Sequence, residues 1–345
     1  MFEMTKAAGG PEEAQCIPGH PFSALIFTLS FWMAHPLAAM AQSTSYPNRT
    51  ISLINPFSPG ASTDIVARVI AQKLTEAWGQ TAVVENRPGA SGMIGLAAVA
   101  RAPADGHMLG MMIVSHATTA ALQGGKLTVD LVRDFSPVTQ VVSQPYLIVV
   151  NPSLPARSVK ELIALARAKP GALTYGSSGI GSVLHLGGEL LAVQTRVQLT
   201  HVPYKGAAPA LADVAGGHLM VQFSTRMSAQ PFIASGRVRA LAVTSSERVP
   251  GLELPTVQES GVTGRYEVNG WYGVVAAAGT PAAIVERLNQ EINRILKMPD
   301  VRERMTVEGT MPAGGTPAQF GELVRSEVEK WRNIIRQAKI APAAQ

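Results

Sequence analysis

The alternation of apolar strands with amphipathic helices from residue 47 onward most narrowly limits what this chain can fold into. Apolar runs such as RTISLINPF, TAVVENR and HMLGMMIVS predict buried strands. After the first run, Val66, Ile70, Leu74 and Trp78 recur every four residues on one helix face, and Gly79 follows as a stop signal. Strands that alternate with helices predict an α/β fold with largely parallel sheets.

The number of strands favours two lobes. About ten strand candidates follow residue 46, which is more than one ordinary sheet holds. A new strand–helix series begins at residue 157, so we expect crossings between lobes near residues 149–151 and 269–271. These crossings assign residues 46–149 and 271–341 to lobe 1 and residues 150–270 to lobe 2. We expect each lobe to be a mainly parallel sheet flanked by helices, with a ligand cleft between the carboxyl ends of the two sets of strands.

The N-terminus has the pattern of a secretory signal peptide. An apolar run at residues 24–33 precedes a small-x-small cleavage pattern that ends at Ala41. The run is shorter than the ~20 apolar residues that a membrane span needs. We therefore expect residues 1–41 to be removed on export. The only cysteine, Cys16, would be removed with them, so the mature chain would have no disulfide and no thiol chemistry.

The charge pattern argues against a nucleic-acid partner. The chain has 29 Lys and Arg against 24 Asp and Glu, and removal of residues 1–41 takes away one Lys and three Glu. The basic residues are scattered and form no stripe interleaved with aromatics. A mild positive charge suits an anionic small ligand. The histidines show no metal-ligand spacing with cysteine or paired acidic residues, so we expect no metal and no cofactor.

The loop in PFSPGASTDIVARV is the first candidate site. A strand end, a run of small residues and a helix start together point free backbone N–H groups and the positive helix end at one spot, as in an anion site. No Gly-Lys-Ser/Thr closes the loop, so it is not a P-loop. An ordinary strand-to-helix turn with a Ser or Thr cap is the alternative. The candidate ligand-binding residues here are Phe57, Ser58, Pro59, Gly60, Ala61, Ser62, Thr63 and Asp64.

The second candidate loop lies in YGSSGIGSVLH, where Ser177, Ser178 and Ser182 offer hydroxyls between a strand and a helix. It fails the fifth position of the Gly-x-Ser-x-Gly nucleophile elbow and also fails the Gly-x-Gly-x-x-Gly dinucleotide pattern. A neutral donor loop suited to carboxylate oxygens remains. Further candidates follow other strands: Ser115 and His116, and then Tyr204 and Lys205. Lys205 would either pair with an anion or be a solvated surface lysine.

Taken together, these segments resemble the Bug family, the periplasmic solute-binding receptors of tripartite tricarboxylate transporters. The similarity extends over residues 47–340 and includes VVENRPGASGMIGLAAVARAPADGHML, VPYKGAAPALADVAGG and GWYGVVAAAGTPAAIVERLNQEI. It implies a two-lobed, type II Venus-flytrap receptor that is not an enzyme. It also implies a small carboxylate ligand, either a di- or tricarboxylate or an aromatic carboxylate, and docking to one large and one small membrane subunit. We expect a monomer.

The resemblance also implies site residues. Residues 59–64 match the family's first ligand loop, and further matches in its second and third segments are Ser177, Ser178, Gly181, Ser182, His185, Tyr204, Lys205 and Gly206. Three positions depart from the family pattern. Ala61 stands where a second glycine is usual, Ala277 where proline is common, and Ser224 where an aspartate follows the strand. The missing aspartate argues against an amine-bearing ligand, and we include Ser224 among the candidate ligand-binding residues.

Two other functions remain open at this point. An exported hydrolase could use Ser178 with His185 or His201, but the sequence offers no clear third group to orient the histidine. A signalling receptor on the same fold would share every feature described so far.

Overall fold

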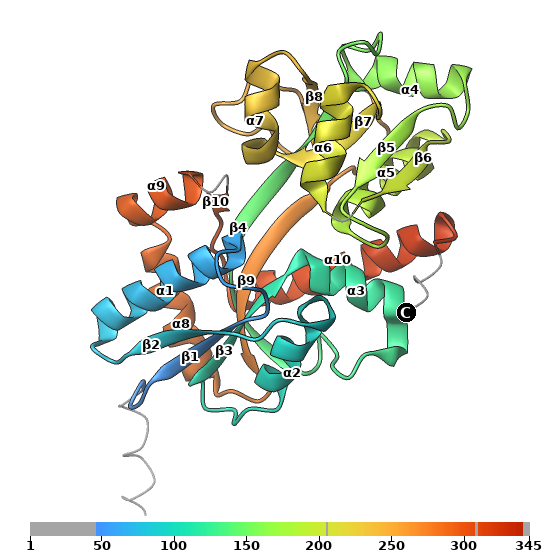
Figure 1. The fold of residues 1–345 in the computed structure, drawn as a ribbon. Coiled ribbons are helices and arrows are strands. Elements are labelled where there is room, and N and C mark those ends of the chain that lie inside the picture. The colour runs from blue at the N-terminus through green and yellow to red at the C-terminus, as the bar shows by residue number, and fades with distance from the viewer. Residues whose placement is uncertain (1–45, 205, 308–309, 341–345) are drawn as a thin grey trace, which may run out of the picture. The chain divides into compact units, whose positions relative to one another are not determined.

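The computed structural model describes residues 46–204, 206–307 and 310–340 (Figure 1). The expected signal peptide, Cys16 and Lys205 lie outside the described residues. The strands are β1 (Ile51–Asn55), β2 (Ala82–Asn86), β3 (Met108–Ile113), β4 (Phe135–Val150), β5 (Thr174–Ser177), β6 (Thr200–Pro203), β7 (Val221–Thr225), β8 (Arg239–Val243), β9 (Asn269–Ala277) and β10 (Met311–Pro312). The α-helices are α1 (Ser62–Trp78), α2 (Met93–Ala100), α3 (Val114–Gln123), α4 (Val159–Ala168), α5 (Val183–Thr195), α6 (Ala207–Gly216), α7 (Arg226–Ala234), α8 (Ala282–Ile295), α9 (Pro299–Val307) and α10 (Pro317–Gln337), with 3-10 turns η1 (Ala90–Gly92) and η2 (Gly124–Lys126).

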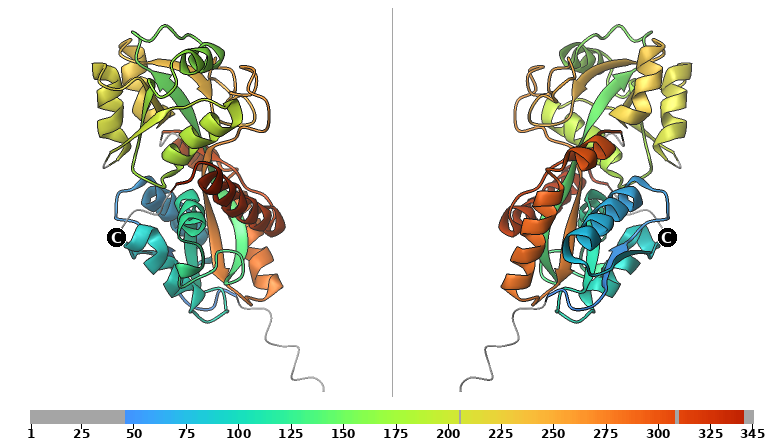
Figure 2. Two further views of the ribbon diagram at one scale, coloured as in Figure 1. Left: turned by 90° about the vertical axis from the view of Figure 1, so that its right-hand side faces the viewer. Right: turned by 90° about the vertical axis from the view of Figure 1, so that its left-hand side faces the viewer.

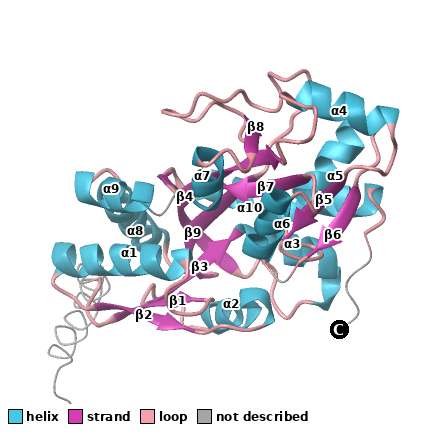
Figure 3. Cartoon of the chain, turned by 45° about the horizontal axis from the view of Figure 1, so that its top comes forward, coloured by secondary structure: helices cyan, strands magenta, loops and turns pink. Residues whose placement is uncertain are grey.

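The strands join edge to edge in one continuous path, in the order β2-β1-β3-β9-β4-β7-β5-β6, with β8 and β10 also paired to β4 (Figure 3). We expected too many strands for a single sheet, and this expectation is wrong, because the strands form one continuous sheet. A single path is possible because β4 is 16 residues long. Its first part, up to Pro145, pairs with β9, and its second part, from Tyr146, pairs with β7 and β8.

Strand direction places two sets of carboxyl ends opposite each other. On one side β1, β2 and β3 are parallel, and β3 ends at Ile113. Ile113 pairs with Tyr272 of β9, and Tyr272 also pairs with Val142 of β4. On the other side β5, β6 and β7 are parallel to one another, and β7 ends at Thr225, the partner of Tyr146. Tyr146 lies four residues beyond Val142, about 13 Å along a strand. The loops that follow both sets of strands therefore converge on the short stretch where β4 exchanges partners.

Helices cover the sheet in pairs. Helix α1 packs beside α8, as the right-hand view of Figure 2 shows in blue and orange, and α3 packs beside α10. The fully buried Trp271 of β9 and Trp331 of α10 both donate their indole N–H to Glu327, at 3.4 and 2.9 Å. Glu327 also pairs with Lys330, so this buried carboxylate has three donors. No described helix combines the length and apolar character that a bilayer crossing requires.

Most of the expected helices and strands are present. Ser158 accepts the backbone N–H of Glu161 at the start of α4, and Thr316 and Gln319 form a complete capping box on α10. Gly79 ends α1 in the left-handed conformation (φ 66°). Pro281 is the N-cap of α8, which therefore begins at Ala282. Three helices were not anticipated from the sequence, namely α3, α7 and α9.

Candidate ligand-binding site

The start of α1 offers open hydrogen-bond donors. Its N-cap is Ala61, which has an extended backbone (φ −68°, ψ 155°) and no side chain able to cap the helix. Among the described residues, the backbone N–H groups of Ser62 and Thr63 have no hydrogen-bond acceptor. The Thr63 hydroxyl is also buried without a partner. An uncapped helix start with a buried free hydroxyl is suited to an anionic group supplied from outside the chain.

Asp64 holds this loop in place. Its Oδ2 accepts the Gly60 N–H at 3.0 Å and Arg68 Nε at 2.9 Å, and its Oδ1 accepts Asn86 Nδ2 at 2.8 Å. Burial by itself would raise the pKa of Asp64, but the hydrogen bonds from Arg68, Gly60 and Asn86 outweigh it and keep that pKa below the ordinary value. Its donors come from the loop, from α1 and from β2, so Asp64 acts as a structural carboxylate that holds the Gly60 N–H and ties the start of α1 to β2.

We expect Asp64→Ala to destabilise the protein by about 1–3 kcal/mol at neutral pH, because three donors lose their hydrogen bonds to a buried, charged acceptor. A folded-state pKa below the unfolded value stabilises the protein above the unfolded pKa, and this stabilisation is lost as pH falls through the folded pKa. The difference in unfolding free energy between the two proteins should therefore be constant from pH 5 to 8 and shrink below about pH 4. Urea unfolding at several pH values measures it. Glu76, an exposed residue of α1 that pairs with Lys73, provides the control, since Glu76→Ala should change stability much less than Asp64→Ala. An equal effect of both substitutions would contradict this role for Asp64.

The start of α3 lies beside that of α1, because β1 and β3 are neighbours. His116 is fully buried, and its Nδ1 accepts the Ile113 N–H at 2.9 Å. Its ring centre lies 5.8 Å from that of Phe57. Its Nε2 lies against Gly92, where an added Cβ would come within 2.4 Å, and makes no well-formed hydrogen bond with the described residues. Burial lowers the pKa of His116 to about 3, so the ring is neutral, and the Ser115 hydroxyl beside it is likewise without a partner.

Several hydroxyl and N–H groups of the β5–α5 loop form hydrogen bonds within the loop itself. Ser177 Oγ contacts the Gly179 N–H and carbonyl, both at 3.1 Å, and His201 Nε2 at 2.7 Å. The Ser182 hydroxyl caps α5 by accepting the His185 N–H, and it donates to the Gly179 carbonyl at 2.8 Å. Among the residues that the structure describes, Ser178 is different: neither its hydroxyl nor its N–H is engaged, and the N–H of Ile180 is also open.

The neighbouring loops complete this second group. The Tyr204 N–H donates to the Ser177 carbonyl at 3.1 Å, and its hydroxyl donates to Asp213 at 2.6 Å, an interaction that raises the pKa of Tyr204 to about 12. Gly206 starts α6 without a side-chain cap. The Ser224 hydroxyl at the end of β7 is fully buried and has no partner within the described chain, and the same holds for Oε1 of Gln222.

The structure thus brings the candidate residues into two groups. Group A comprises the starts of α1 and α3, with Phe57, Ser62, Thr63, Asp64, Ser115 and His116. Group B comprises the loops after β5, β6 and β7, with Ser177, Ser178, Gly181, Ser182, His185, Tyr204, Gly206 and Ser224. Helix α3 also meets group B, because a Cβ on Gly181 would lie 2.6 Å from the Leu122 side chain.

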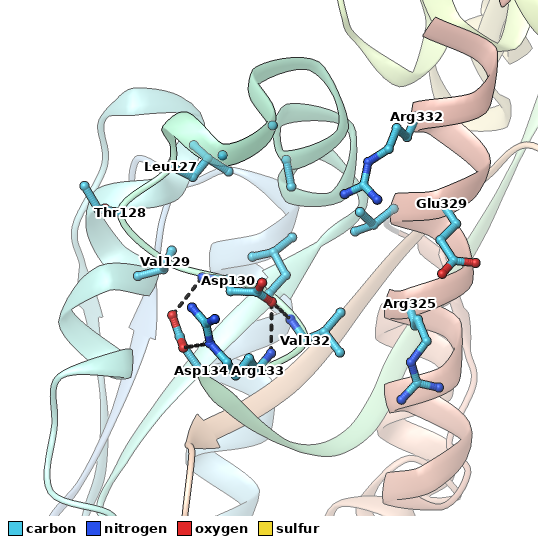
Figure 4. A pocket seen from close by; sticks show the side chains of 15 residues that line it. Leu127, Thr128, Val129, Asp130, Val132, Arg133, Asp134, Arg325, Glu329 and Arg332 are labelled. Atoms are coloured by element: carbon cyan, nitrogen blue, oxygen red, sulfur yellow. Dashed lines mark hydrogen bonds and ion pairs between the residues drawn. The ribbon is translucent and has the colours of Figure 1, made fainter. Parts of the chain in front are cut away.

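Cavities of the described residues lie away from these loops, and two of them are large. One, of about 710 Å³, lies between residues 127–134 and α10 (Figure 4), where Asp130 and Asp134 already accept from backbone N–H groups and from Arg133. The other, of about 860 Å³, is lined by parts of β4 and α7, by parts of residues 249–252, and by Arg302, Thr306 and residues 310–312. It includes the exposed Arg226 and Met227 at the start of α7. Neither cavity is lined by a residue of group A or group B.

Several residues that shape the site were not found from the sequence. Asn55 and Asn86 both donate to the Phe57 carbonyl, at 3.2 and 3.0 Å, and so fix the turn before α1. Gly92 lies against His116, and His201 contacts the Ser177 hydroxyl. Asn86 ends the strand next to β1, and a polar residue in that position was the available signal. His201 was considered only as a base for a hydrolase, and no local signal indicated its contact with Ser177, which lies 24 residues away.

Paired lobes with open helix starts at facing strand ends define the class of two-lobed periplasmic solute-binding proteins. A family model described as the tripartite tricarboxylate transporter family receptor matches residues 66–340, and the chain belongs to this family. BugT of Bordetella pertussis is 35% identical over 306 residues, which cover 87% of this chain and 93% of BugT. The solved structure of Rpa4515 from R. palustris with adipate is 38% identical, with a TM-score of 0.71, over 86% of this chain and 100% of that one. MatC from Rhodopseudomonas palustris with bound malate is 31% identical, with a TM-score of 0.67, over 84% and 100%.

Proposed function

We propose that this receptor captures a small organic carboxylate in the periplasm, between groups A and B, and releases it unchanged to a tripartite tricarboxylate transporter. One observation carries the proposal. Open N–H groups at uncapped helix starts, and buried polar atoms without partners, lie at the two sets of strand ends that face each other along β4. Charge-assisted bonds from such donors to a carboxylate are about twice as strong as neutral ones. The adipate and malate bound to the two related structures support a dicarboxylate as the ligand.

We also propose that the lobes are residues 46–149 with 271–341, and residues 150–270, and that they close as a hinge around the ligand. The exchange of strand partners at Pro145 and Tyr146, opposite Asn269, supports a hinge at this level of β4 and β9. Closure would bring the donors of group B onto a carboxylate already held by group A.

The proposed receptor is not an enzyme, although a serine and a histidine are in contact. Ser177 Oγ lies 2.7 Å from His201 Nε2, but Ser177 is completely buried and its hydroxyl also contacts Gly179. Ser178, the serine considered for a hydrolase, makes no hydrogen bond to either histidine within the described chain. A nucleophile needs both a base and access to substrate.

The proposed cycle begins with export, after removal of residues 1–41. It ends with docking of the closed, monomeric receptor to one large and one small membrane subunit. A signalling role would use the same capture step, and it would differ only in the membrane partner.

A thermal-shift and calorimetry panel tests capture. We expect adipate or malate to raise the melting temperature with concentration, by the equivalent of about 2.7 kcal/mol at 100 times Kd. The diamide of adipic acid has the same length but no charge, and it should give no shift. If no organic anion shifts the melting temperature, while a sugar or an organic cation does, the proposed ligand class is wrong.

A further inference from the structure

Two stacked histidines, His185 and His201, hold the β5–α5 loop through hydrogen bonds. The rings of His185 and His201 are nearly parallel, with centres 3.8 Å apart and an interplanar angle of 18°. His185 Nδ1 accepts the Gly181 N–H at 3.0 Å, and His201 Nε2 contacts the Ser177 hydroxyl that in turn holds Gly179. The backbone N–H groups of Gly179 and Gly181 are therefore held by hydrogen bonds that involve this pair of histidines.

The protonation state of His185 follows from its partners. Since Gly181 donates to Nδ1, that nitrogen carries no proton, and the remaining proton is on Nε2, 3.8 Å from Oε1 of Glu189. Oε1 of Glu189 already accepts a hydrogen bond from the Tyr175 hydroxyl, at 2.6 Å. A proton added to Nδ1 would displace the Gly181 N–H, so the observed loop requires the neutral ring.

The groups around the pair favour the same state. Burial lowers the pKa of His185 to about 4, and repulsion from His201 acts in the same direction; burial also lowers the pKa of His201 to about 4. Burial raises the pKa of Glu189 although the Tyr175 hydroxyl acts in the opposite direction, and burial chiefly raises the pKa of Tyr175. From α3 the neighbour of this loop is the uncharged Leu122, and Tyr266 donates its hydroxyl to the Gly187 carbonyl within α5.

We propose that His185 and His201 are positioning residues of the β5–α5 loop, which act as neutral imidazoles and leave the N–H groups of Ser178 and Ile180 to face the ligand. This inference rests on the carboxylate capture proposed above. It excludes a cationic role for His185, in which the ring itself would pair with the carboxylate. Binding should therefore take up no proton, although the ligand is an anion and two histidines lie under its loop.

Calorimetry of adipate binding at pH 7.0, in buffers of different ionisation enthalpy, measures the protons taken up. We expect a value near zero, because the histidines are neutral both before and after binding. An ordinary histidine, with a pKa near 6.5, is mostly neutral at this pH and would take up most of a proton on pairing with an anion. Uptake approaching one proton would overturn the proposal.

Three variants separate positioning from mere packing. His185→Asn places an amide oxygen near the position of Nδ1 and should bind adipate within about 3-fold of the wild type. His185→Ala and His185→Gln do not restore that acceptor, and they should bind at least about 10-fold more weakly. Equal affinities for all three variants would contradict the proposal.

Nitrogen NMR of the wild-type imidazoles covers the case in which the variants do not fold. We expect His185 to show an unprotonated Nδ1 and a protonated Nε2 at pH 7, with titration near pH 4. A protonated Nδ1 at pH 7 would refute the assignment whether or not a ligand binds. If the wild type binds no carboxylate, the capture function fails; if it binds with proton uptake, only the role of the histidines fails.

Discussion

Ser62→Pro should weaken carboxylate binding by about 10- to 100-fold while leaving the fold intact. Proline lacks the backbone N–H, so the substitution removes one open donor from the start of α1. Loss of a hydrogen bond to a charged group costs about 1.5–3 kcal/mol. Proline is well tolerated at the first helical position, and Ala61 already has the extended backbone that a residue before proline prefers. Titration calorimetry with adipate or malate measures the change.

Ser62→Ala is the matched control for this variant. It removes the hydroxyl and keeps the N–H, so it should bind within about 3-fold of the wild type. Circular dichroism and the melting temperature should be unchanged in both variants. If Ser62→Pro binds normally, the carboxylate is not held at the start of α1; if Ser62→Ala loses as much affinity as Ser62→Pro, the hydroxyl and not the N–H is the donor.

Gly273→Ala should be among the most destabilising single-methyl changes in the chain. Gly273 lies in the middle of β9, and a Cβ there would come within 2.1 Å of Cζ of Phe320 in α10. Phe320 is 1% exposed and its ring packs edge-on against Trp271, at 5.8 Å, so it has little room to move. Overpacking of this kind costs about 1–3 kcal/mol or more. We expect the melting temperature to fall by about 5–10 °C.

Calorimetric scans of four proteins test this contact. Adding Phe320→Leu to Gly273→Ala should recover part of the lost stability, because a smaller side chain makes room for the new methyl group. Gly125→Ala is the control, since no atom lies within 4 Å of its added Cβ and its backbone does not need glycine. A Gly273→Ala protein as stable as the control would show that β9 and α10 pack less closely than described.

Local sequence signals predicted the elements whose ends are marked by specific residues. The Gly79 stop concerns contacts within a few residues, and Gly79 ends α1 as expected. Helix α3 follows β3 directly after Ile113, which cannot cap a helix, and its Ser and Thr residues obscured the helical period. Helix α7 contains Pro231, which argued against a helix. These helices form because the topology packs them on the sheet.

The candidate site could be predicted in outline only. Parallel strands bring their carboxyl ends together, so the grouping of the loops followed from the order of strands and helices. The order of strands and helices did not show which hydroxyls remain without a hydrogen bond. Ser177 and Ser178 are adjacent in sequence, yet Ser177 contacts His201 and Gly179 while Ser178 is unengaged within the described chain. Contacts between residues that are far apart in the sequence decide this, and a single sequence does not display them.

A crystal structure of the adipate complex tests the central claim most directly. The account predicts one carboxylate of adipate within hydrogen-bond distance of the Ser62 and Thr63 N–H groups, and the closed lobes bringing Ser178 of group B onto the ligand. Adipate bound instead in the 860 Å³ cavity, with its carboxylates on Arg226 and Arg302, would contradict it.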